Sequence, residues 1–193
     1  MTRHVPAEVK RTHTTTPVDL TPHLDGTAFT TRSDLHAGRL NVWGNSLPAD
    51  SVQGHVLVAG GIPFELPARG SGPDHVRCGG QLVRLPPVGA DWLHLLATSE
   101  RRCEEVAMVH YASGAVDPEW LRVSDFWPAH AHFGEVEAVR TTAMHYPHHR
   151  QEDLGGQLWA VRVPVTRREP VHALRLPDNP ALHVFAITAE TVR

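Results

Sequence analysis

The sequence predicts an all-β protein: a single-domain antiparallel β-sandwich of the jelly-roll type. Short apolar runs recur along the chain, and segments rich in Gly, Pro and Asp separate them. No stretch keeps the 3.6-residue period of an amphipathic helix between capping residues. A chain of 193 residues fits one domain with its own core.

The elements follow in order along the chain. Residues 1–17 are polar, end in a threonine run and are expected to form a flexible or edge-strand tail, so that the sandwich domain spans 18–193. Strands are expected at 39–43, 55–66, 75–78, 81–85, 92–98, 104–113, 120–124, 135–142, 158–165, 171–176 and 182–188.

Turn chemistry explains how these strands connect. The glycine pair 60–61 predicts a bend inside 55–66, and Gly79-Gly80 predicts a two-residue hairpin between 75–78 and 81–85. The segment HYPHHRQEDLGG (145–156) is expected to be a loop.

The best helix candidate is SERRCEEVAMVHYA (99–112), and it too favours a strand. Val106, Met108 and His110 would share one face of a strand, while the residues between them would share the other. This alternation has the period of a pleated strand.

Composition excludes several classes of function. The net charge is −3, the arginines are scattered and Lys10 is the only lysine, so nothing predicts a nucleic-acid partner. No apolar run approaches the roughly 20 residues of a membrane span, and the N-terminus lacks a secretory pattern, so we expect a cytoplasmic protein. Cys78 and Cys103 are accordingly expected to be reduced thiols.

The segment SDFWPAHAHFGEVEAVRTTAMHYPHHR (124–150) holds the densest group of histidines. His130 and His132 are two residues apart and would share one face of an extended chain, a spacing that suits two ligands of one transition metal. Further ligands would come from His145, His148, His149 and His110, with Glu135 or Glu137 as the carboxylate. Without a metal, a histidine beside Asp125 would serve as an acid–base pair near neutral pH. The sequence leaves both interpretations open.

Aromatic residues near predicted loops suggest a binding role. Trp127, Trp43, Phe133 and Tyr146 would stack on a sugar or another cyclic ligand, and Arg140 or Asp125 would bond its hydroxyls. The remaining tryptophans lie within apolar strand patterns and are expected in the core, namely Trp92, Trp120 and Trp159.

Six sequence segments, taken in chain order, point to a known family: VDLTPHLDGTAF, GIPFELP, GGQLVRLPP, WLHLLATSE, VSDFW and LPDNPALHVFAIT. Together they resemble the galactose-binding-domain-like β-sandwich modules of bacterial, especially actinobacterial, glycoside hydrolases. The resemblance covers about Val18 to Thr191. It implies a jelly roll that binds carbohydrate at loops on one end. It also implies a structural calcium held by Asp19, Asp25 and Glu190.

We therefore expect a sandwich that binds a small polyhydroxylated or cyclic ligand. Its wall would comprise Trp127, His130, His132, His145 and Arg140, with Trp43 as a weaker member. The alternative is a cytosolic cyclase, isomerase or lyase of secondary metabolism that uses His130, His132, His145 and Asp125 as acid and base. Apart from calcium no cofactor is indicated, and pairing of sheet faces would give a homodimer.

Overall fold

The computed structural model describes residues 12–127 and 130–192. Within these ranges the regular elements are β-strands and three short 3₁₀ helices, with no α-helix. The helices are η1 (Thr21–His23), η2 (Leu35–Ala37) and η3 (Ala49–Ser51). The strands are β1 (His13–Val18), β2 (Phe29–Thr30), β3 (Leu47–Pro48), β4 (Val56–Ala59), β5 (Ile62–Glu65), β6 (Val76–Arg77), β7 (Leu82–Val88), β8 (Trp92–Ser99), β9 (Cys103–Tyr111), β10 (Val116–Val123), β11 (Val136–Arg140), β12 (Ala143–Tyr146), β13 (His149–Glu152), β14 (Gln157–Pro164), β15 (Val171–Arg175) and β16 (Leu182–Val192).

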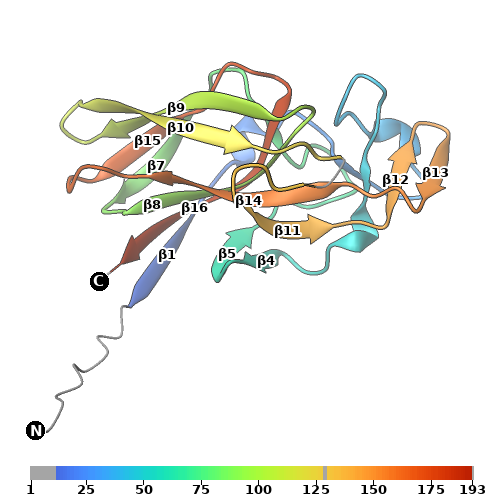
Figure 1. Cartoon of the computed structure of the whole chain (residues 1–193), viewed down its shortest axis with the longest axis horizontal. Coiled ribbons are helices and arrows are strands. Elements are labelled where there is room, and N and C mark those ends of the chain that lie inside the picture. Colours follow the sequence, from blue (N-terminus) through green and yellow to red (C-terminus); the bar gives the residue numbers. More distant parts are fainter. Residues whose placement is uncertain (1–11, 128–129, 193) are drawn as a thin grey trace, which may run out of the picture.

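Two antiparallel sheets face each other and form the sandwich (Figure 1). The larger has the order β1-β16-β8-β14-β11, with β6 also pairing with β16, and the smaller has the order β10-β9-β15-β7. Three two-stranded units complete the fold: β2-β3, β4-β5 and β12-β13. The all-β sandwich prediction is confirmed.

The first hydrophobic core fills the space between the two large sheets. Its side chains include Leu93 and Leu95 of β8, Val109 of β9 and Ile187 of β16. Burial of such aliphatic side chains contributes about 1.5–3 kcal/mol each. This layer is therefore the main source of stability.

A second core lies on the opposite face of the six-stranded sheet, under β2, β4, β5 and β12. It joins Phe29, Phe64 and Leu47 to Leu96 of β8 and Phe185 of β16. The central strands of the large sheet are thus buried on both faces. This explains why their sequences are nearly continuous apolar runs rather than alternating ones.

The 39–43 prediction is wrong, because these residues form a turn. The side-chain oxygen of Asn41 accepts hydrogen bonds from the backbone N–H groups of Trp43 and Asn45, each at 3.1 Å. An asparagine that bonds the backbone two residues onward closes a turn instead of extending a strand.

The glycine pair 79–80 does not form the predicted hairpin. The strand before it, β6, pairs with β16 in the large sheet, and the strand after it, β7, pairs with β15 in the small sheet. Gly80, with φ of 76°, turns the chain from one sheet to the other. By contrast, Gly60 and Gly61 join β4 and β5 in a tight hairpin, with φ of 58° and 81°.

The segment 145–156 is not the loop that its composition suggests, because part of it pairs. β12 and β13 form an antiparallel hairpin in which Tyr146 lies opposite His149. Their rings stack with centroids 4.9 Å apart and an angle of 6°. Over residues 12–127 and 130–192, no helix has the length and apolar character needed to cross a bilayer.

Candidate functional site

A groove of about 490 Å³ lies between the edge strand β10 of the small sheet and strand β14 of the large one. We call it the β10–β14 groove. Its polar and aromatic side chains are His94, Trp120, Arg122, Phe133, Glu135 and Arg162. Its volume falls within the range of small-molecule sites in proteins.

The groove exists because β11 covers only part of β14. Residues 136–140 of β11 pair with 157–160 of β14, whereas residues 161–164 of β14 have only β8 as a partner. The connection that leads into β11 turns away at Gly134, whose φ is 77°. Exposed strand edge and aromatic side chains are thereby left on the same side.

Glu135 fixes this connecting loop. One carboxylate oxygen accepts the backbone N–H of Ser124 at 2.8 Å, and the other accepts that of Phe133 at 2.9 Å. Hydrogen bonds to a charged acceptor are stronger than neutral ones. The side chain predicted as a metal ligand therefore holds the wall of the groove in place.

Trp120 and Arg122 form the β10 wall. Alternate residues of a strand share a face, and the Arg122 guanidinium carbon lies 5.3 Å from the Trp120 ring centroid. Arg122 also pairs with Glu104, with 3.0 Å between Nε and Oε2. The Trp120 side chain remains 56% exposed, so the prediction that it lies in the core is wrong. Trp159 is buried as predicted.

The opposite wall carries a second stacked arginine. Arg162 of β14 lies across from His94 of β8 in the sheet register. Its guanidinium carbon is 4.4 Å from the ring centroid of Trp92. The guanidinium therefore lies over the Trp92 ring, within cation–π range, and Arg162 lines the groove.

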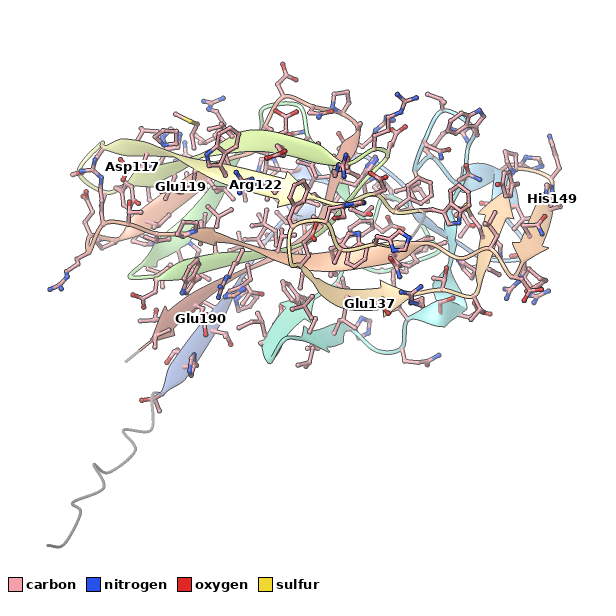
Figure 2. The ribbon with its side chains drawn as sticks, in the orientation of Figure 1. Asp117, Glu119, Arg122, Glu137, His149 and Glu190 are labelled. Atoms are coloured by element: carbon pink, nitrogen blue, oxygen red, sulfur yellow. The ribbon has the colours of Figure 1, made fainter. Side chains whose placement is uncertain are left out.

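Beside this wall lies a carboxylate that is hydrogen-bonded to two histidines. Glu190 of β16 accepts hydrogen bonds from His94 Nε2 at 2.8 Å and His13 Nδ1 at 2.6 Å. Burial acts to raise the pKa of Glu190, but the two histidines outweigh it and leave that pKa below its usual value. The bridge ties β1 to β16 and β8. Figure 2 labels Glu190 near β1 and Arg122 on β10.

The two histidines predicted as a metal pair lie at the surface. The rings of His130 and His132 have centroids 6.4 Å apart, and both side chains are exposed. His132 Nδ1 accepts a hydrogen bond from Arg102 Nη1 at 3.0 Å. Neither histidine lines the β10–β14 groove.

His145 and Asp125 lie in different surroundings. His145 is buried, bonds Thr30 Oγ1 through Nδ1 at 2.8 Å, and has a pKa lowered chiefly by burial. Asp125 is partly buried, and its backbone carbonyl accepts the Trp159 indole N–H at 3.0 Å. The structure does not gather the predicted acid–base residues around one cavity.

The predicted stacking residues are divided among smaller features. Trp127, 48% exposed, and Arg140 line one cavity of about 370 Å³, where Arg140 also bonds Glu137. Trp43, 68% exposed, lines another cavity of about 340 Å³. Tyr146 is covered by His149, which Figure 2 labels at the β12–β13 end.

The three carboxylates expected to bind calcium are engaged separately. Asp19 accepts the backbone N–H of Thr21 at 2.9 Å, Asp25 accepts that of Arg77 at 2.8 Å, and Glu190 holds the two histidines. Among the described residues, no group of three or more His, Cys, Asp or Glu side chains could hold a metal ion. Neither the calcium nor the transition-metal expectation has a ligand set there.

Sequence reasoning missed a buried polar chain. Asp74 Oδ1 lies 3.0 Å from His75 Nδ1, His75 Nε2 lies 3.1 Å from His183 Nδ1, and His183 Nε2 lies 3.7 Å from Glu100. Gly26 leaves room for it, because a Cβ there would lie 2.3 Å from His75 Nε2. The sequence does hint at this chain, because a histidine interrupts each of two apolar strand patterns: His75 in HVRC and His183 in LHVFAIT.

Comparison with known proteins supplies a family. No curated protein matches the chain. One family model, described as the AziU2-like beta-sandwich domain, matches residues 13–193, a range that includes every strand of both sheets. That match and the two-sheet architecture agree, and the chain belongs to the AziU2-like β-sandwich domain family.

Proposed function

We propose that the β10–β14 groove binds a small, ring-containing, polyhydroxylated ligand such as a carbohydrate. The observation that carries this proposal is the exposed Trp120 indole on the wall of the β10–β14 groove. An indole half in contact with water presents an apolar face to the C–H groups of a sugar ring. What sets this indole apart is its place on the wall of a groove that also carries two arginines, Arg122 and Arg162.

The polar groups around the indole suit hydroxyl recognition. Arg122 and Arg162 offer N–H donors from opposite walls, while His94 and Glu135 are each held by hydrogen bonds. Groups fixed in advance lose little conformational entropy when a ligand arrives. The groove thus combines one flat apolar surface with polar groups that are already oriented.

Catalysis is the weaker proposal. Acid–base chemistry requires a titratable group within reach of the reacting atom. The histidines and the aspartate predicted for that role lie outside the groove, and the titratable groups that line it, His94 and Glu135, are already hydrogen-bonded to the protein. Binding is therefore the function that the geometry supports best.

The test is a binding screen of the whole chain against a panel of monosaccharides and short oligosaccharides, followed by titration calorimetry of any hit. Trp120→Ala is expected to weaken binding at least tenfold, because loss of one stacking platform costs on the order of 1–3 kcal/mol. Trp127→Ala is the matched control, since that indole is also about half exposed but lines a different cavity.

The two variants separate the outcomes. Loss of binding in Trp120→Ala and retention in Trp127→Ala would support the groove. The reverse pattern would place the ligand in the Trp127 cavity and overturn the proposal, as would a panel in which no sugar binds.

A further inference from the structure

We infer that the ligand of the β10–β14 groove carries an oxyanion, a carboxylate or a phosphate, which the guanidinium of Arg162 binds. This inference rests on the proposed function, because it names the chemistry of the ligand for the same groove. It starts from a comparison of the arginines that stack on aromatic rings.

Among the described residues three arginines stack in this way, and two of them have a carboxylate partner. Arg122 lies over Trp120 and pairs with Glu104 at 3.0 Å. Arg167 lies over Tyr111 and pairs with Asp117 at 2.7 Å. In both cases the protein supplies the counter-charge.

Arg162 differs from both. Its guanidinium lies closer to its ring than the other two do, 4.4 Å from the Trp92 centroid, yet within residues 12–127 and 130–192 it has no hydrogen bond and no ion pair. Stacking uses the face of a guanidinium and leaves its N–H donors free in the plane. Arg162 thus brings to the groove a cation that lies over an aromatic ring and has N–H donors without a partner among the described residues.

The carboxylates near the groove are already engaged. Both oxygens of Glu135 accept backbone N–H groups, and both oxygens of Glu190 accept histidine N–H groups. Glu104 lies across the groove on Arg122. None of these three carboxylates forms an ion pair with Arg162, so among the described residues its charge is left for a ligand.

The shape of the guanidinium identifies the class of ligand. Its parallel N–H groups match two oxygens of a carboxylate or phosphate, and such bidentate contacts are about twice as strong as neutral hydrogen bonds. Arg122 on the opposite wall adds a second positive charge. An acidic sugar or a sugar phosphate would place its ring on Trp120 and its oxyanion on Arg162.

The experiment compares four probes: glucose, glucuronate, glucose 6-phosphate and inorganic phosphate. Titrations at constant ionic strength are followed by the indole N–H resonances of Trp92 and Trp120 and by calorimetry. The two charged sugars are expected to bind at least tenfold more tightly than glucose. Inorganic phosphate is expected to shift the Trp92 resonance alone.

Two substitutions assign that preference to Arg162. Arg162→Gln is expected to remove the tenfold preference for charged sugars, and Arg162→Lys to keep only part of it, because lysine has the charge without the planar fork. Arg167→Gln is the control, a stacked arginine whose charge is already met by Asp117. Thermal unfolding verifies that each variant is folded, and the exposed position of Arg162 makes a large change unexpected.

The outcomes distinguish this inference from the proposed function. Equal binding of charged and neutral sugars, sensitive to Trp120→Ala but not to Arg162→Gln, would overturn the oxyanion and leave sugar binding in place. A phosphate-induced shift at Trp92 without binding of any sugar would support the anion site and overturn the carbohydrate proposal. Absence of any shift with all four probes would overturn both.

Discussion

His183 is a buried imidazole whose protonation state follows from its neighbours. Asp74 accepts the backbone N–H groups of Ala28 and Phe29, each at 2.8 Å, and its Oδ1 accepts a hydrogen bond from His75 Nδ1 at 3.0 Å. His75 Nε2 then accepts from His183 Nδ1. His183 Nε2 is left as a lone pair without a hydrogen-bond partner among the described residues.

This arrangement predicts loss of stability in mild acid. Burial lowers the pKa of His183 to about 4, although Glu100 partly opposes it. The unfolded chain, with a histidine pKa near 6.5, therefore binds more protons between pH 4 and 6.5 than the folded chain. Stability contributed by neutral His183 is complete above pH 6.5 and falls by up to about 3 kcal/mol as the pH drops toward 4.

Urea midpoints measured from pH 8 to pH 4 check this expectation. His183→Gln should be less stable at pH 8 but should lose stability less steeply below pH 6.5. His55→Gln, at an exposed position, should keep the slope of the original protein. An unchanged slope in His183→Gln would mean that other groups cause the acid sensitivity.

Individual residues also show where sequence reasoning works. Trp159 lies in an apolar run of a central strand and is buried, as its neighbours predict. Trp120 lies in a similar run, WLRV, but β10 is the edge strand of its sheet, so its outer face meets water. Strand position within a sheet depends on long-range pairing, which a local pattern does not encode.

The connection between β13 and β14 depends on close backbone approach. Thr141 donates its backbone N–H to the carbonyl of Gly156 at 2.9 Å and accepts the backbone N–H of Gly156 on Oγ1 at 2.8 Å. A Cβ at Gly155 would lie 1.6 Å from the carbonyl oxygen of Thr141. Asp153, with φ of 58°, adds a positive backbone angle to the same turn.

Gly155→Ala is therefore expected to destabilise the protein by roughly 2–4 kcal/mol, because backbone rather than a flexible side chain must move. Gly89→Ala is the control, since nothing lies within 4 Å of a Cβ there. Denaturant unfolding of both variants measures the difference. Equal stability of the two would show that the turn relaxes freely.

The positions of most strands could be predicted from the sequence, but which strands pair with one another in the sheets could not. The long apolar runs mark β8, β9, β14, β15 and β16, whose burial on one or both faces leaves a strong signal. The groove was not predictable as a site, because its walls come from β8, β10, β14 and the loop before β11. Phe133 and Glu135 were singled out by type, but only the fold shows that they line the same groove as Trp120 and Arg162.

The whole molecule has two hydrophobic cores that share one sheet. Strand β8 sends Leu93 and Leu95 into the first core and Leu96 into the second, and β16 is divided in the same way. Neither core can lose its packing without exposing the strands of the other. We therefore expect the chain to unfold in a single cooperative transition.

Leu93→Ala in the first core and Phe64→Ala in the second test this expectation. Each should lower one shared melting temperature, with a cost of about 2–5 kcal/mol. The calorimetric and van't Hoff enthalpies should agree in both variants. Val58→Ala, exposed on β4, should leave the melting temperature almost unchanged, and two separate transitions in either core variant would contradict the shared-sheet account.

The position of β16 has a consequence for biosynthesis. This strand lies inside the large sheet, paired with β1, β8 and β6, yet it follows all three in the sequence. While the ribosome is still adding residues 100–181, the strand that lies between β1 and β8 has not yet been made. Both hydrophobic cores lack the side chains of β16 during this time. They therefore stay incomplete until residues 182–192 have been synthesised, and their exposed apolar side chains make the nascent chain prone to aggregation until then.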